Sequence, residues 1–272
     1  MRYFILNSSG NVGKTTVSRE VLYSFMENPK IIEIETVNAS SAGYENLNLE
    51  KITDFSNFEE VYLKIIENES LIVDVGASNL GAFMDKLSEF AGVETLFDAF
   101  IIPTVGGDKV MTDTAKTILF LKNMGIANNQ IKVVFNNADL ISEFDLLIKQ
   151  EKALDYKFDT DLFIPKSKLF GELGILRKTI NEIYNEDINA YKDLILSAEP
   201  KEKLKLIKID LANRMAVSIY PKLKAIYERL SGESAYNNLA NKPSENNVCK
   251  ASKPTKKEEV KETLVNDEDE EL

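Results

Sequence analysis

The 272-residue chain carries a net charge of −11 and contains one cysteine and no histidine. Without histidine, Ser-His-Asp catalysis, Cys-His catalysis and every histidine metal site are excluded, so a bound metal must have oxygen ligands, as Mg²⁺ on a nucleotide does. The single Cys249 excludes a disulfide framework within the chain, and the acidic balance disfavours general DNA binding.

Residues 3–16 predict a phosphate-binding loop. The apolar run at 3–6 predicts a buried strand, turn-forming residues follow at 7–11, and Gly13-Lys14-Thr15-Thr16 begins a helix. Strand, glycine-containing loop, Gly-Lys-Thr and helix are the parts of a Walker A motif. The sequence departs from the full pattern G-x-x-x-x-G-K-[ST] at one position, where Ser8 replaces the first glycine. The alternative is a chance Gly-Lys-Thr at the start of a helix.

The chemistry of phosphate binding asks for these residue types. Gly10 and Gly13 can take backbone angles closed to other residues, so that successive N–H groups point at phosphate oxygens. Lys14 would reach the β- and γ-phosphates, and the Thr15 hydroxyl would ligate Mg²⁺. The nucleotide-binding residues expected from this loop are Ser9, Gly10, Asn11, Val12, Gly13, Lys14, Thr15 and Thr16.

The next expected strand, at 31–35, alternates apolar and acidic residues. Glu35, at its end, is a candidate to orient or activate the attacking water, and Glu33 is a candidate to support the Mg²⁺ shell. The alternative is an edge strand with an exposed acidic face. A loop is expected over 36–57, and an amphipathic helix over 58–68.

Residues 71–77 match a Walker B strand, with four apolar residues around Asp74 and Gly76 at its end. An aspartate inside such an apolar strand is costly without a cation or hydrogen-bond partners. We therefore expect Asp74 to hold Mg²⁺, usually through a water, and Gly76 to let the backbone approach the γ-phosphate.

Expected helices and strands continue to alternate after residue 77. A helix is expected to about 90, a strand at 100–103, a helix from 108 to 123 and a strand at 131–135. Gly106-Gly107 is either a switch hinge or a tight turn. After the last strand, Asn136 is expected to contact a nucleotide base. Asp139 either reads guanine or, as we favour, caps a helix over 142–154.

The C-terminal part is predicted to be mainly helical. A short strand at 162–165 is followed by helices over 179–185, 188–198 and 200–230, with a kink or break at Pro221. Residues 231–272, rich in Asn, Lys, Glu and Ser, predict a disordered tail. The expected domains are an α/β nucleotide-binding core at 1–165, a helical extension packed on it at 166–230, and the tail at 231–272. The expected fold is doubly wound α/β with a mainly parallel sheet.

Five segments in this order, SGNVGKTT, IEIETVNAS, IVDVGASN, IIPTV and KVVFN, resemble the StbB-type plasmid stability proteins, within the ParA/MinD-like P-loop ATPases. The resemblance covers about residues 1–200. Residues 7–16 resemble the deviant Walker A form N-x-K-G-G-x-G-K-T-T, with Ser9 in place of the signature lysine and Asn11 in place of a glycine. The StbB-type subgroup also lacks that lysine.

The resemblance implies a plasmid maintenance ATPase that uses ATP and Mg²⁺ and works with a DNA-bound partner protein. It implies that Lys14, Thr15, Glu35 and Asp74 serve the nucleotide, with Glu35 where the family has an aspartate. The signature lysine contacts nucleotide across a dimer, so Ser9 leaves a nucleotide-dependent homodimer and dimer-dependent hydrolysis open. Lys109 is a candidate substitute cation.

Three functions are consistent with these motifs. The first is an ATP-driven switch in plasmid stability or DNA segregation, which predicts slow turnover of ATP. The second is a small-molecule kinase or ligase of the same fold, for which no acceptor-site pattern is visible. The third is a nucleotide-binding adaptor in plasmid maintenance or conjugation with little hydrolysis, which the missing lysine favours. Whether ATP or GTP is preferred stays open.

The expected location is the cytoplasm, with association to nucleoid or plasmid as a further expectation of the resemblance. No apolar run approaches the length of about 18 to 20 residues that a membrane span needs, and no signal-peptide pattern follows Met1. Residues 166–230 are net basic, whereas the remainder is net acidic. That segment is the expected contact with an anionic surface such as DNA, and solvated helix faces are the simpler alternative.

Overall fold

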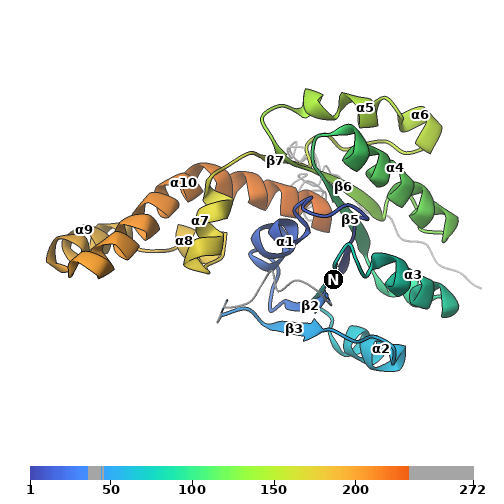
Figure 1. Ribbon diagram of the computed structural model, residues 1–272, viewed down its shortest axis with the longest axis horizontal. Coiled ribbons are helices and arrows are strands. Elements are labelled where there is room, and N and C mark those ends of the chain that lie inside the picture. The colour runs from blue at the N-terminus through green and yellow to red at the C-terminus, as the bar shows by residue number, and fades with distance from the viewer. Residues whose placement is uncertain (36–43, 45, 233–272) are drawn as a thin grey trace, which may run out of the picture.

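The computed structural model describes residues 1–35, 44 and 46–232 (Figure 1). The predicted tail therefore lies outside the described residues, apart from Ser231 and Gly232. Among these residues, no helix combines the length and the apolar character needed to cross a bilayer.

A seven-stranded sheet forms the centre of the fold. Its order is β3-β2-β4-β1-β5-β6-β7, and every neighbouring pair is parallel. The strands are β1 (Arg2–Ile5), β2 (Lys30–Ile34), β3 (Leu49–Ile52), β4 (Leu71–Val75), β5 (Ala99–Thr104), β6 (Ile131–Ala138) and β7 (Phe163–Pro165). The chain moves from β1 toward one edge and from β5 toward the other, which confirms the doubly wound parallel α/β fold and leaves a crevice beside β1.

Helices cover both faces because successive strand residues point to opposite sides. Phe4 packs with Phe83, Phe97 and Phe100 on one face. That face carries α2 (Phe58–Glu67), α3 (Leu80–Glu89), η2 (Val93–Leu96), α4 (Asp108–Asn123), η3 (Ile141–Phe144), α5 (Asp145–Ile148) and α6 (Glu151–Leu154). Tyr3 and Ile5 point to the other face, which carries η1 (Val17–Tyr23), α7 (Leu169–Leu176), α8 (Ile180–Tyr184) and α10 (Pro200–Ser231).

The helix that follows the phosphate-binding loop is enclosed on all sides. It begins as α1 (Lys14–Thr16) and continues as the π-helical η1, in which residues 17–22 are all buried. Among these are Arg19 and Glu20. The sheet lies on one side of η1 and α10 on the other, so charged side chains here need partners within the protein.

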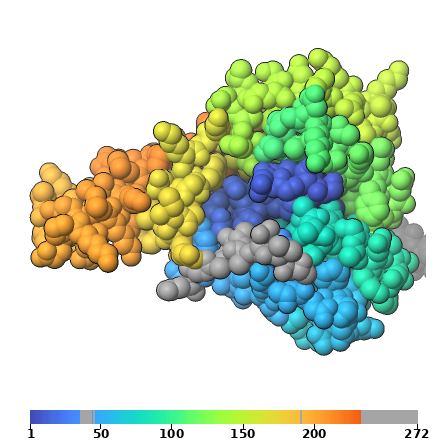
Figure 2. Space-filling model, in the orientation of Figure 1, coloured from blue at the N-terminus to red at the C-terminus, as the bar shows by residue number. Residues whose placement is uncertain are grey.

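The C-terminal helices stand out from the sheet. α9 (Ile188–Ser197) and the first turns of α10 project away from the strands, as the orange region at the left of Figure 2 shows. α10 is one helix of 32 residues, so the chain does not break at Pro221, and the kink predicted as the other possibility stays a prediction. Pro221 is exposed, whereas Ile219 and Leu223 on either side are buried in one continuous core. That shared burial keeps the helix together despite the missing N–H.

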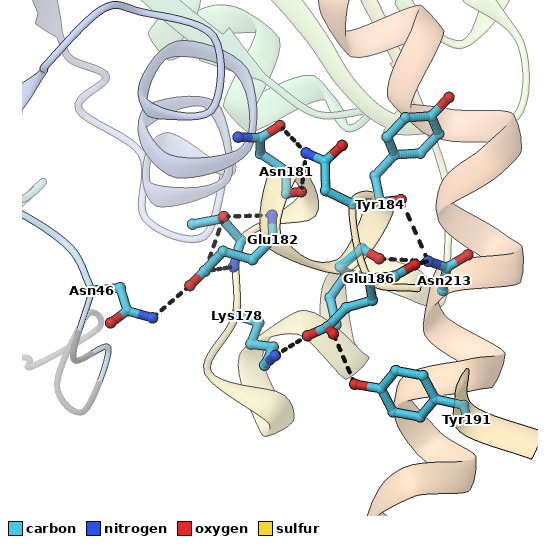
Figure 3. A network of polar contacts seen from close by, with 11 residues as sticks. Asn46, Lys178, Asn181, Glu182, Tyr184, Glu186, Tyr191 and Asn213 are labelled. Atoms are coloured by element: carbon cyan, nitrogen blue, oxygen red, sulfur yellow. Dashed lines mark hydrogen bonds and ion pairs between the residues drawn. The ribbon is translucent and has the colours of Figure 1, made fainter. Parts of the chain in front are cut away.

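A polar network joins α8 to α10 (Figure 3). Asn213 of α10 is 1% exposed, and its Nδ2 donates to the carbonyl of Ile183 at 2.7 Å and to that of Glu186 at 3.3 Å. The Glu186 carboxylate pairs with Lys178 and accepts from the Tyr191 hydroxyl at 2.8 Å. Asn213 thus adds a buried side-chain donor at the end of α8, where the carbonyl of Ile183 also accepts from the backbone N of Glu186 at 3.3 Å.

Two further expectations differ from the structure. β3 lies in the stretch 36–57 that was expected to be a loop. Its charged residue Glu50 pairs with Lys30 and Lys64, so an edge strand forms although its sequence is short and half polar. The helix expected over 142–154 is divided into η3, α5 and α6. The carboxylate of Glu143 accepts from the backbone N of Asp139 at 2.7 Å, so Glu143, and not Asp139, caps this segment.

Candidate nucleotide-binding site

A cavity of about 770 Å³ opens at the carboxyl ends of β1, β2 and β4. Its lining includes residues 10–16 of the predicted phosphate-binding loop, the acidic residues Glu33, Glu35 and Asp74, and Gly76, Ala77 and Ser78. The structure therefore brings together residues from three separate sequence segments that were predicted to share a site. Ser9 and Asn136, also predicted, do not line the cavity.

The loop geometry depends on Gly13. Its φ is 92°, and a Cβ at this position would lie 1.9 Å from Nδ2 of Asn136. Asn11 also has a positive φ, of 57°. A Cβ at Gly10 would meet no atom within 4 Å, so the special role predicted for two glycines falls on Gly13 alone.

Asn136 supports the loop from behind. It is buried, and its Nδ2 donates to the carbonyl of Val12 at 3.0 Å. The contact of Asn136 with a nucleotide base stays a prediction. With its amide engaged against the loop backbone, Asn136 fixes the turn in which Gly13 sits.

Lys14 lies inside the loop and is 9% exposed. Its Nζ donates to the carbonyls of Ser9 at 3.2 Å and Asn7 at 3.4 Å. Burial lowers the pKa of the Lys14 ammonium, and the carboxylates of Asp74 and Glu35 partly oppose that shift. The ammonium is thus held against backbone oxygens on the cavity wall, with carboxylates close enough to influence its ionisation.

Two buried carboxylates face the loop. Glu33 and Asp74 are register partners on β2 and β4, and they are 4% and 5% exposed. Burial, and then the charge of Glu33, raise the pKa of Asp74 to about 7, while Lys14 and Arg19 oppose the shift. A cation between these oxygens would relieve the cost of burying them.

This donor chemistry fits Mg²⁺ on a nucleotide. Asp74, Glu33 and the hydroxyl of Thr15 supply oxygen ligands around one cavity, and oxygen is the ligand that Mg²⁺ requires. In the described part of the chain, no group of three or more acidic or cysteine residues is arranged to hold a metal by itself. Mg²⁺ commonly completes its shell with waters and phosphate oxygens.

Helix α4 anchors the loop through residues that the sequence analysis did not identify. The Ser9 hydroxyl donates to Asp113 Oδ2 at 2.7 Å, and the backbone N of Ser9 donates to Asn7 Oδ1 at 2.8 Å. Nδ2 of Asn7 in turn donates to Oγ1 of Thr114 at 3.1 Å. No local motif marks Asp113 or Thr114. Both are polar residues of α4, Thr114 buried and Asp113 half-buried, and their contacts with the loop appear only once α4 is packed against it.

In the family that the sequence resembles, the position of Ser9 carries the signature lysine. Here the Ser9 side chain instead donates to the carboxylate of Asp113. Gly107, at the start of α4, has a φ of 120°, which requires glycine at this turn. The structure shows the geometry of a turn there. The hinge role of Gly106-Gly107 and the cation role of Lys109 stay predictions.

No protein-family model matches the chain, and no curated protein matches it. Among solved structures, it is similar to the MinD cell division protein of Aquifex aeolicus, at 14% identity over 78% of this chain and 95% of that one, with a TM-score of 0.47. MinD of Pyrococcus horikoshii OT3, complexed with Mg-ADP, has 17% identity over 77% and 94%, with a TM-score of 0.42. A ParA family ATPase from Chlorobium tepidum TLS has 14% identity over 78% and 97%, with a TM-score of 0.41. These TM-scores are below 0.5, so the fold assignment rests on the strand order and the loop geometry.

Proposed function

We propose that this chain is a P-loop ATPase that binds ATP with Mg²⁺ and acts as a nucleotide-driven switch in plasmid stability or partition. The observation that carries the ATPase part is the convergence of Lys14, Thr15, Glu33 and Asp74 on one cavity at the carboxyl ends of the strands. Ligands of open α/β sheets bind at this edge.

Each group has a distinct role in this proposal. Backbone N–H groups of residues 10–16 bind the phosphates, and Lys14 leaves its carbonyl partners to pair with the β- and γ-phosphates. Thr15 and Asp74 hold Mg²⁺, with Glu33 supporting its shell, and the bound ion neutralises charge on the phosphates. Glu35, on the same cavity wall, orients the attacking water.

The plasmid role rests on the ordered motifs that resemble StbB-type proteins and includes a DNA-bound partner protein. A nucleotide-dependent homodimer and association with nucleoid or plasmid belong to the same proposal. Residues 166–230 are proposed to form a helical extension packed on the 1–165 core. Contacts between α10 and η1 support this, because η1 directly continues the helix that begins with Lys14.

A nucleotide-binding adaptor with little hydrolysis is the second candidate. The observation that favours it is the Ser9–Asp113 hydrogen bond, which puts a hydroxyl and a carboxylate where a cation is expected. Under this alternative, nucleotide binding persists and turnover is absent, even with plasmid DNA and partner present.

The decisive experiment measures binding and turnover of ATP and GTP by wild-type protein and by Lys14→Ala, with and without DNA. We expect at least a tenfold loss of affinity and of turnover in Lys14→Ala, because a charge-assisted contact to phosphate is removed. Lys149→Ala is the matched control, since Lys149 is exposed just after α5, pairs with Asp145 and lies outside the cavity. Unchanged nucleotide affinity in a folded Lys14→Ala protein would refute the proposal.

A further inference from the structure

We propose that Ser78 and Asn79 are positioning residues that hold the Glu35 carboxylate over Gly76 at the cavity wall, and that hydrolysis depends on this hold. The inference rests on the proposed ATPase function and concerns how its water-orienting group is placed. Ser78 and Asn79 lie in the turn between β4 and α3, and Glu35 directly follows β2. Because β2 and β4 are neighbours in the sheet, the contact joins the carboxyl ends of two adjacent strands.

The carboxylate of Glu35 is held by two donors. Oε1 accepts from the Ser78 hydroxyl at 3.2 Å and from Asn79 Nδ2 at 3.5 Å. Asn79 Nδ2 also donates to the carbonyl of Ile34 at 3.3 Å. One amide group therefore contacts both the backbone at the end of β2 and the side chain that follows it.

Asn79 has the features of a residue placed for this contact. It stands at the N-cap of α3, yet its side chain makes no hydrogen bond to the first turn of its own helix. It is 6% exposed, and its backbone is fixed by a bond from its N to the carbonyl of Gly76 at 3.0 Å. The Asn79 amide therefore contacts Glu35 and the end of β2 and does not cap α3. Ser78 is exposed and is expected to contribute less.

Gly76 provides the space in which the carboxylate lies. A Cβ at residue 76 would be 2.1 Å from Glu35 Oε2 and 2.7 Å from its Cδ. The backbone N of Gly76 donates to the carbonyl of Ile34 at 2.9 Å, which fixes the distance between the two strand ends. The Glu35 carboxylate is thus confined between the Gly76 backbone and the donors at 78 and 79.

This placement suits a group that acts on water. In ATP hydrolysis, the water oxygen forms a bond to the γ-phosphorus, and the bond from that phosphorus to the β–γ bridging oxygen breaks. A carboxylate held at the cavity wall accepts a hydrogen bond from the water and takes its proton, which then passes to the released phosphate. An unrestrained glutamate would spend less time in the productive orientation.

The test is a double-mutant cycle on turnover and nucleotide affinity, with Asn79→Ala, Glu35→Gln and the double variant. Asn57→Ala is the matched control, because Asn57 is also an N-cap asparagine but contacts Glu60 at the start of α2, outside the cavity. Ser78→Ala is measured beside them. Thermal unfolding of each variant reports any loss of folded protein separately from the effect on kcat.

We expect Asn79→Ala to lower kcat about tenfold with nucleotide affinity within about twofold of wild type, the range of a lost orienting contact. In the Glu35→Gln background, Asn79→Ala should have no further effect on kcat. An equal fall in both backgrounds, or unchanged kcat in Asn79→Ala, would overturn the inference. Wild-type protein that binds ATP without hydrolysing it would also overturn the inference and leave nucleotide binding standing. Failure to bind ATP at all would overturn the proposed function itself.

Discussion

Glu33 and Asp74 stand directly opposite each other on adjacent parallel strands, both buried and both acidic. Register partners in a parallel sheet point to the same face, so their charges repel where water is largely excluded. Most proteins would avoid this arrangement, because it destabilises the folded state unless a cation is present. The pair lines the same cavity as Lys14 and the loop, and in the proposed function a bound cation offsets this cost.

The first prediction concerns Asp74→Asn. Without nucleotide, this variant should be at least as stable as wild type at neutral pH, because one member of a repelling buried pair is neutralised. With nucleotide, it should lose the dependence of affinity on Mg²⁺, since a metal-binding oxygen has lost its charge. Thermal unfolding and nucleotide titrations with Mg²⁺ or with EDTA measure the two effects. A variant with wild-type Mg²⁺ dependence would show that Asp74 does not hold the metal.

The second prediction concerns pH and Glu20. Burial raises the pKa of the Glu20 carboxyl to about 7, and Glu182 adds to the shift, while Arg19 and the backbone N of Ile180 oppose it. A carboxyl whose pKa is raised in the folded state contributes stability that is fully present below its unfolded pKa and is lost as the pH rises through about 7.

Glu20→Gln should therefore flatten the fall in unfolding free energy between pH 5 and 8, while the amide oxygen still accepts from Ile180 N, which lies 2.8 Å from Glu20 Oε2. Chemical denaturation across this pH range measures the slope. Because Asp74 titrates in the same window, Asp74→Asn is the comparison, and each variant should remove only part of the slope. An unchanged slope in Glu20→Gln would contradict the prediction.

The third prediction compares two glycines of one loop. Gly13→Ala forces a side chain onto a φ of 92° and against Asn136, so nucleotide affinity should fall at least tenfold and stability should drop by about 1 to 3 kcal/mol. Gly10→Ala adds a Cβ in open space and should leave stability within about 0.5 kcal/mol of wild type. Equal effects of the two substitutions on stability, measured by denaturation, would show that the loop conformation differs from the one described.

The strands and the loop were predictable because their signals are local. Residues 3–16 and 71–77 carry short-range patterns of apolar runs and turn formers, and such patterns specify strand, turn and helix without help from distant residues. β3 was missed because four residues with a charged centre carry no strong pattern. It forms against β2, with Glu50 paired to two lysines. Pro221 does not end α10, because the burial of Ile219 and Leu223 on either side of it outweighs the local preference of proline for a helix end.

The amino-acid sequence by itself determined the alternation of the other strands with helices, though not β3, together with the position of the phosphate-binding loop and the acidic residues that would face it. Only the tertiary structure decided that Asn136 supports the loop from behind, that Asp113 holds Ser9, and that Asn79 holds Glu35. These contacts join residues 44 or more positions apart. Their geometry depends on strand register and helix packing, which short-range patterns do not specify.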